Sequence, residues 1–255
     1  MRVAAVQIEV DTASRTETLQ RALSAIDAAA EMDPAPDLVV LPAFLDTCGD
    51  GPQSKLEYVY GPGTSACGFR ARSWGVFVAM GLAERSLPLP RLKSVLYDRD
   101  GDHRLIQSMS RPGDALRKWY QSEGKPLGVA RVLVGRIALL TDDDIVSEDA
   151  WREVVQQGAQ LIVGTIGGGA TTAKSLETAL KKYTKQFGRP CVVADLTTGR
   201  QKIALPRTGV SRIVDADGEI LAAATSGVAD IITADLSLPV DDTSDGALTA
   251  SGVGE

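Results

Sequence analysis

The chain has few of the residues from which metal, redox and aromatic binding sites are built. Its 255 residues include a single histidine, His103, and three cysteines, while aromatic residues make up 5% of the total. The cysteines, Cys48, Cys67 and Cys191, are widely spaced and cannot complete a zinc site with one histidine. We therefore expect no metal and no cofactor, and we expect the reduced thiols of a cytoplasmic protein.

Basic charge and long apolar runs are also scarce. The chain carries 27 basic and 33 acidic residues, a net charge of −6, which disfavours nucleic acid as a partner. The longest apolar runs have the length of strands, so no membrane span is predicted. The chain begins directly in a predicted strand, residues 3–10, which leaves no room for a signal sequence.

What the sequence does contain is an alternation of strands and helices. Apolar residues at helical spacing, with Ser14 suited to cap the first helix, predict helices over 15–32, 63–73, 148–157 and 173–187. Apolar runs predict strands over 3–10, 37–42, 76–82, 94–98, 105–109, 131–140, 160–165, 190–195, 209–215, 220–224 and 230–235. This order predicts one α/β domain over residues 1–238, followed by an Asp-, Ser- and Gly-rich flexible tail over 239–255.

The most informative segment is a predicted buried strand that ends in three acids. The strand runs to Leu140 and Thr141 and is followed by Asp142, Asp143 and Asp144. Ligand sites of open α/β folds lie at the carboxyl ends of strands. Adjacent carboxylates repel one another, so some of these acids must be solvated, protonated or paired with cations.

Three interpretations of the acid run stay open, and we favour the first. Asp142 pairs with Arg111 or another cation, while Asp143 and Asp144 cap the following helix or accept hydrogen bonds. Alternatively, a metal binds there, for which at most Asp142 and Asp144 can cooperate because neighbouring strand residues point to opposite faces. In the third interpretation Asp142 is a nucleophile, although its attack on an amide would give a poor anhydride intermediate.

Two further features near strand ends are candidates for a site. The triplet Gly167–Gly169 lacks the Lys-Ser/Thr of a phosphate-binding loop, so we expect it to form a flexible rim or to let a small ligand approach the backbone. Cys48 lies a few residues beyond the second predicted strand and could be a relocated nucleophile. It has no histidine nearby in the sequence to activate it, so we expect an incidental thiol.

The order of segments resembles the nitrilase, or carbon–nitrogen hydrolase, superfamily over Met1 to about Leu238. The resemblance is carried by the opening strand, by strand ends, by hairpin turns and by the closing turn: RVAAVQ at 2–7, LVVLP at 38–42, WGVFVAMGLAER at 74–85, VLYDRDG at 95–101, GAQLIV at 158–163 and TGVSRIVDADG at 208–218. It implies a four-layer α-β-β-α sandwich, with two mixed sheets inside and helices outside. It also implies a homodimer in which outer helices of two subunits pack together.

The three catalytic positions implied by the resemblance depart from the family pattern. Members attack an amide or nitrile carbon with a cysteine thiolate, assisted by a glutamate base and a lysine that stabilises developing charge. Here the glutamate position after Leu41-Pro42 is Ala43. The cysteine of the family's Cys-x-Asp motif falls on Asp142, and the acid of that motif falls on Asp144. A gapless alignment places Met109 at the lysine position, and the nearest cation is Arg111.

These substitutions predict a protein of the superfamily that has lost thiol-based amide and nitrile hydrolysis. On this interpretation it binds an unidentified small molecule or acts as a scaffold, and the residues we expect to contact a ligand are Asp142, Asp144, Arg111, Gly167 and Gly168. The alternative is a hydrolase of carbon–nitrogen bonds other than peptide bonds, with a non-standard site built around Asp142 and Arg111.

Overall fold

The computed structural model describes residues 1–10, 14–43, 56–167, 172–197 and 209–240. Its helices are α1 (Arg15–Ala30), α2 (Pro62–Trp74), α3 (Asp114–Arg117), α4 (Glu148–Gln156) and α5 (Ala173–Phe187), with a 3-10 helix η1 (Asp142–Val146) before α4. Among these described residues no helix is long and apolar enough to cross a membrane. The expected tail lies outside the described residues from position 241 onward.

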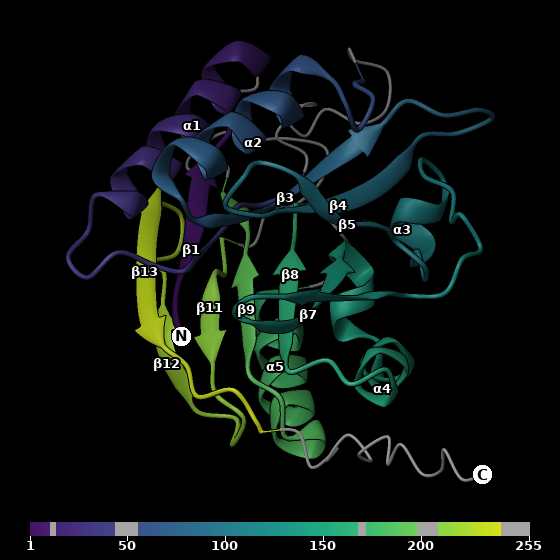
Figure 1. Ribbon diagram of the computed structural model, residues 1–255. Helices are drawn as coiled ribbons and strands as arrows, with labels where there is room; N and C mark the ends of the chain where they lie inside the picture. Colours follow the sequence, from purple (N-terminus) through teal and green to yellow (C-terminus); the bar gives the residue numbers. More distant parts are fainter. Residues whose placement is uncertain (11–13, 44–55, 168–171, 198–208, 241–255) are drawn as a thin grey trace, which may run out of the picture.

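Two sheets form the centre of the described structure (Figure 1). The first has the order β10-β1-β2-β3-β4-β5, with β13 beside β1, and consists of β10 (Leu196–Thr197), β1 (Arg2–Glu9), β2 (Leu38–Val40), β3 (Phe77–Glu84), β4 (Arg91–Tyr97), β5 (His103–Ser108) and β13 (Asp230–Asp235). The second has the order β12-β11-β9-β8-β7-β6 and consists of β12 (Ile220–Ala223), β11 (Arg212–Val214), β9 (Cys191–Ala194), β8 (Leu161–Thr165), β7 (Gly135–Thr141) and β6 (Val129–Val132).

Both sheets mix parallel and antiparallel neighbours. In the first sheet β1, β2 and β3 are parallel, whereas β4 and β5 continue the sheet as antiparallel strands. In the second sheet β7, β8 and β9 are parallel. The carboxyl ends of these parallel strands are where an α/β fold places its ligand sites.

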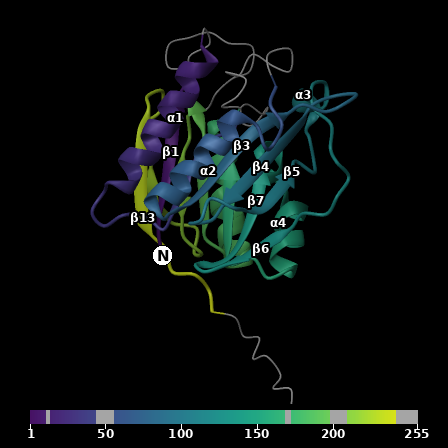
Figure 2. The ribbon, with the colours of Figure 1, turned by 45° about the horizontal axis from the view of Figure 1, so that its top comes forward.

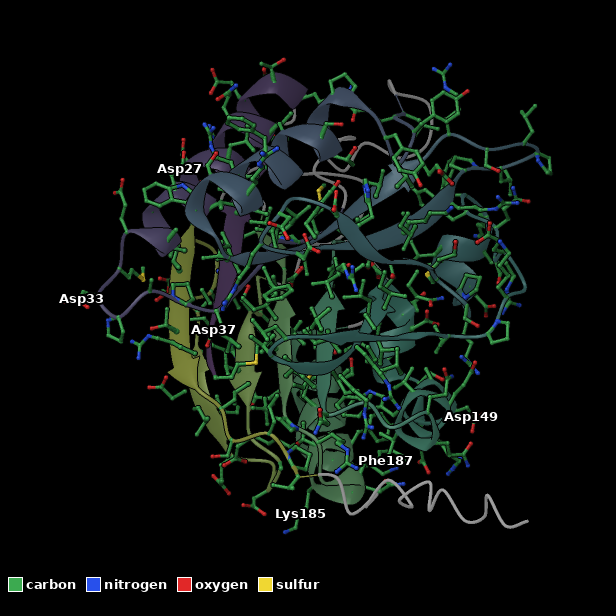
Figure 3. The ribbon with its side chains drawn as sticks, in the orientation of Figure 1. Asp27, Asp33, Asp37, Asp149, Lys185 and Phe187 are labelled. Atoms are coloured by element: carbon green, nitrogen blue, oxygen red, sulfur yellow. The ribbon has the colours of Figure 1, made fainter. Side chains whose placement is uncertain are left out.

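Helices cover the outer face of each sheet (Figures 1 and 2). The buried apolar side chains form three clusters: one that joins the first sheet to helices α1 and α2 and also includes Ala43 and Met109, one between the two sheets, and one between the second sheet and helices α4 and α5. Phe187 at the end of α5 and Asp149 at the start of α4 mark the last of these layers (Figure 3). The predicted four-layer α-β-β-α sandwich is thereby confirmed.

Local sequence signals explain where the helices begin and end. The Ser14 side chain accepts the backbone N–H of Glu17 and caps α1. Helix α2 begins at Pro62, which needs no N–H there, and ends at Gly75, whose φ of 64° suits glycine. The predicted single strand over 131–140 is wrong, because the chain reverses at residues 133–134 and Gly135, with φ of 135°, starts a second strand.

Candidate functional site

The carboxyl ends of β2, β3 and β8 meet between the two sheets. Ala43 follows β2, and its backbone N–H donates to the carbonyl of Ile166, just after β8, over 3.0 Å. Gly81 on β3 lies so close to this point that an added Cβ would stand 2.7 Å from the Cα of Ala43 and 2.8 Å from the Oγ1 of Thr165. Only glycine fits at position 81, since a larger side chain would separate the sheets here.

The site is apolar on the side of the first sheet. Ala43 and Met109 are both fully buried and belong to the same apolar cluster, together with Ala83 and Leu92. The Met109 backbone N–H donates to the carbonyl of Leu92 over 2.8 Å, which extends the pairing of β5 with β4 by one residue. Ala43, at the expected glutamate position, and Met109, which the gapless alignment places at the lysine position, therefore present neither an acid nor a cation, and Arg111 stays the alternative for the lysine position.

The site is acidic on the side of the second sheet. Asp142 is the first residue of η1 and is 2% exposed, and its Oδ2 accepts the backbone N–H of Gly167 over 3.1 Å. Its φ of 48° lies in the left-handed region, which Asp tolerates better than most residues with a side chain. Ala43 and Asp142 thus bond to consecutive residues, Ile166 and Gly167, at the exit of β8.

The other two acids hold the segment that follows β5. The carboxylate of Asp144 accepts two neighbouring backbone N–H groups, of Ser110 and Arg111, each over 2.8 Å. The Oδ2 of Asp143 accepts the backbone N–H of Gly113 over 2.8 Å. The acid run therefore has backbone partners on two separate segments, 110–113 and Gly167.

Asp144 is fully buried, and its protonation reflects that burial. Loss of water raises the pKa of Asp144 to about 6, and this effect outweighs the two backbone N–H groups and the nearby Arg111 charge, which favour the ionised form. The negative charge of neighbouring Asp143 makes a smaller contribution to this rise of the pKa. Because the carboxyl group of Asp144 holds the backbone at residues 110–111, the hydrogen bonds that fix this segment should depend on pH near 6.

The expected side-chain pair between Asp142 and Arg111 is wrong. The Arg111 guanidinium lies 2.6 Å from the carboxylate of Glu153 on α4 and also donates to the Ser110 hydroxyl. The reason is that Asp144 fixes the backbone of Arg111, and from there the side chain reaches α4 at the half-exposed surface. Arg111 is linked to the acid run through its backbone N–H, a contact that side-chain reasoning could not predict.

Three buried hydroxyl groups lie between the sheets next to the site. The Ser94 Oγ lies 2.6 Å from the Oγ1 of Thr141 and 2.6 Å from the Oγ1 of Thr165, so β4 is joined to β7 and β8. All three residues are fully buried. Sequence reasoning missed this group, although polar residues at the ends of apolar strands were its signal.

The remaining candidates divide between buried residues and residues outside the described chain. Gly167 contacts Asp142, whereas Gly168, Gly169 and Cys48 lie outside the described residues.

Cys67 and Cys191 are buried and free. Burial raises the pKa of the Cys67 thiol to about 12 and also raises the pKa of Cys191, so neither is an activated thiolate. Within the described ranges no group of three His, Cys, Asp or Glu residues could hold a metal ion.

Comparisons with known proteins agree on one family. The family model described as carbon-nitrogen hydrolase matches residues 2–240. A mutant of an amidase from Nesterenkonia AN1, of the nitrilase superfamily, is 20% identical, with a TM-score of 0.81 over 93% of this chain and 92% of that chain. A carbon-nitrogen hydrolase from Helicobacter pylori G27 is 18% identical, with a TM-score of 0.80 over 93% and 89% of the two chains. No curated protein sequence matches the chain.

Proposed function

The chain belongs to the carbon–nitrogen hydrolase family, and from this premise we propose that it has lost the family's thiol-based hydrolysis of amides and nitriles. In its place we propose a protein that binds a small molecule or acts as a scaffold. The observation that carries the proposal is the pair Ala43 and Met109, both fully buried in one apolar cluster where the family chemistry needs an acid and a cation.

Each substitution removes a separate part of the reaction. Without a glutamate at Ala43 no side chain at that position can take the proton of a nucleophile. Without a lysine at Met109 the developing negative charge on the substrate loses its electrostatic stabilisation, which is commonly the largest single contribution to catalysis. With Asp142 at the nucleophile position, attack on an amide would form an anhydride rather than a thioester.

The runner-up, a hydrolase that uses Asp142 and Arg111, receives less support. It needs a cation free to act beside Asp142, and the Arg111 guanidinium instead lies 2.6 Å from Glu153. We propose Asp142, Asp144, Arg111, Gly167 and Gly168 as the residues nearest a bound ligand. Asp142 and Gly167 have the strongest support because they contact one another at the carboxyl ends of β7 and β8.

The test of the proposal is an assay of the purified protein on a panel of amides, nitriles and N-carbamoyl compounds, before and after treatment with iodoacetamide. We expect no turnover in either case and no functional change on alkylation. Amide hydrolysis that iodoacetamide abolishes would overturn the proposal and would direct attention to Cys48.

Three further parts of the proposal concern the protein as a whole. We propose a homodimer that associates through outer helices, where a cavity of about 500 Å³ opens beside α5 with Val146, Ala179 and Tyr183 in its lining. Light scattering during gel filtration tests the homodimer, and a monomer at micromolar concentration would exclude it.

We also propose a cytoplasmic location, supported by the two buried free thiols, and a single domain over residues 1–238.

A further inference from the structure

A cavity of about 320 Å³ opens at the end of the sandwich opposite to the candidate site. It lies between the turn that joins β4 to β5 and the turn that joins β6 to β7, and its lining includes Phe77, the first residue of β3. The candidate site lies at the carboxyl ends of the parallel strands, whereas this cavity lies at the amino ends of β3 and β7. Its volume is at the lower end of the range of roughly 300–1,000 Å³ for small-molecule sites, which favours a small ligand.

The guanidinium of Arg99, in the turn between β4 and β5, is held in one orientation beside the cavity. Its Nη2 donates to the Oδ1 of Asp37 over 2.9 Å, and the other oxygen of that carboxylate accepts the backbone N–H of Arg2. Its Cζ lies 5.4 Å from the centre of the Phe77 ring. The Arg99 Nε is buried and has no hydrogen-bond partner among the described residues. Asp37, labelled in Figure 3, and the ring thus orient a guanidinium that still has N–H groups for a planar acceptor.

Arg104 on β5 brings a second guanidinium to the cavity. Its side chain is 47% exposed, and its Nη1 lies 3.8 Å from the Oδ2 of Asp98, beyond the distance of a hydrogen bond. Guanidinium groups bind carboxylates through parallel, charge-assisted N–H bonds. Arg99 and Arg104 together therefore form a binding position for a carboxylate.

Acidic side chains of the same turn limit which anions fit. The Oδ1 of Asp98 accepts the backbone N–H groups of Asp100 and Asp102, and its Oδ2 is the atom nearest to Arg104 in their ion pair. Asp100 lines the cavity and is exposed. Its negative charge repels a polyanion and attracts an ammonium group. Two arginines and two aspartates in one small lining therefore suit a zwitterion.

The turn between β6 and β7 makes part of the lining apolar. Val132 and Leu133 line the cavity together with Phe77. Leu133 is 83% exposed, so most of its apolar surface stays in water until another group covers it. An apolar group of a ligand gains free energy by covering this surface. The lining thus combines a position for a carboxylate, an acid and an apolar wall.

We propose that this cavity binds a free α-amino acid with an apolar side chain. The carboxylate of the ligand pairs with Arg99 and Arg104. Its ammonium group lies near Asp100, and its side chain packs against Phe77 and Leu133. This position is separate from the ligand site of the proposed function and does not rest on it.

Isothermal titration calorimetry of the wild type with leucine and three analogues tests the proposal. Glycine lacks the apolar side chain, isocaproate lacks the ammonium group and isoamylamine lacks the carboxylate. We expect leucine to bind at least about tenfold more tightly than each analogue. No binding of leucine at millimolar concentration, or an analogue that binds as tightly as leucine, would overturn the proposal.

Three surface variants test where leucine binds. Arg104→Ala should weaken leucine binding about tenfold or more, whereas Arg152→Ala, which removes an arginine of α4 that is 46% exposed, should leave it unchanged. Asp100→Asn should weaken leucine binding and strengthen isocaproate binding, because it removes both the attraction for the ammonium group and the repulsion of the carboxylate. Leu133→Ser should weaken leucine binding by removing part of the apolar wall.

Equal melting temperatures of the variants and the wild type show that the change lies in binding. Leucine affinity that is unchanged in Arg104→Ala, Asp100→Asn and Leu133→Ser would overturn the proposal, since leucine would then bind elsewhere. Amide hydrolysis by the wild type would overturn the proposed function and leave this inference standing.

Discussion

The two sheets supply opposite kinds of residue to the site at which they meet. From the first sheet come Ala43 and Met109, which are fully buried within one apolar cluster. From the second comes the acid run that begins with Asp142, and each of its carboxylates accepts at least one backbone N–H. One side of the site is lined by these apolar side chains, and the other carries carboxylates.

The difference shows two ways in which side chains are stabilised in a buried site. An apolar side chain in a closed cluster has no desolvation cost and gains packing. A buried carboxylate is stable only when hydrogen bonds replace the water it has lost, and backbone N–H groups of segments 110–113 and Gly167 do so here. The acids therefore hold neighbouring segments in place.

Returning charge to the apolar side should have the largest effect. Ala43→Glu and Met109→Lys each bury an uncompensated charge, so each should lower the free energy of unfolding by about 3–5 kcal/mol. Because we propose that the two positions meet in one site, the double variant should lose less than the sum of the single variants, with a coupling of about 0.5–3 kcal/mol. Urea unfolding of all four proteins measures the cycle.

Met109→Leu is the control for the cycle, since it conserves volume and polarity and should cost less than about 1.5 kcal/mol. Additive losses from Ala43→Glu and Met109→Lys would contradict the convergence of the two positions. Losses below about 1 kcal/mol for each would show that the apolar side is open to water.

On the acidic side, Asp144 should make stability depend on pH. Burial raises its pKa to about 6 from the ordinary value of 3.8. Between these values the folded chain keeps a proton that the unfolded chain has lost, so this group lowers the free energy of unfolding as the pH rises. A shift of about two pH units corresponds to about 3 kcal/mol, at roughly 1.36 kcal/mol for each unit.

Asp144→Asn removes this titration and isolates its contribution. The free energy of unfolding of the wild type minus that of Asp144→Asn should fall by about 2.4 kcal/mol from pH 4 to pH 7, most of the full change of about 3 kcal/mol. Asp149→Asn, on a side chain that is 76% exposed, serves as the control and should show a constant difference. A constant difference for Asp144→Asn as well would contradict the raised pKa.

A smaller effect is expected where the acid run contacts Gly113. A Cβ at Gly113 would stand 2.9 Å from the Oδ2 of Asp143, so Gly113→Ala displaces the carboxylate from its backbone N–H. Loss of this hydrogen bond destabilises the protein, and the stiffer unfolded chain of the alanine variant offsets part of the loss. The free energy of unfolding should therefore fall by about 1–2 kcal/mol. Gly128→Ala, whose nearest atom would be the Leu105 side-chain end at 3.3 Å, should change stability by less than about 0.5 kcal/mol. Equal effects of the two variants would contradict the account of Asp143.

The smallest effect is expected for Arg111→Ala. The partly exposed pair with Glu153 should contribute less than about 1 kcal/mol, and the bond from the Arg111 backbone to Asp144 stays. A buried pair with Asp142 would instead give a loss of about 3–5 kcal/mol. Urea unfolding distinguishes the two, and a large loss would restore the pair expected from the sequence.

The sequence predicts the layers of the fold because each strand and helix carries its own apolar pattern. The predicted helix over 173–187 coincides with α5, which Thr172 caps and Gly188 ends. The break between β6 and β7 escapes this reasoning, because apolar residues stand on both sides of Gly135-Arg136 and Leu133 looks like a core residue, although it is 83% exposed at the turn. An apolar side chain at a turn resembles a strand residue in the sequence, and only the backbone conformation separates the two.

The candidate site is less predictable because backbone groups make most of its contacts. The sequence shows that Asp142, Asp143 and Asp144 need partners, and the nearest cation, Arg111, is the natural candidate. Every residue other than proline has a backbone N–H, so the sequence gives no signal for which of these groups a carboxylate will bind. The bonds to Ser110, Gly113 and Gly167 are therefore visible only in three dimensions.

The most direct test of the account is a paired assay of ammonia release from the amide panel by the wild type and by the triple variant Ala43→Glu, Met109→Lys, Asp142→Cys. We predict that the wild type releases no ammonia. If any ammonia release is abolished by iodoacetamide, it should come from the triple variant alone. Such thiol-sensitive release by the wild type would contradict the claim that the substitutions at Ala43, Met109 and Asp142 ended the family's chemistry in this chain.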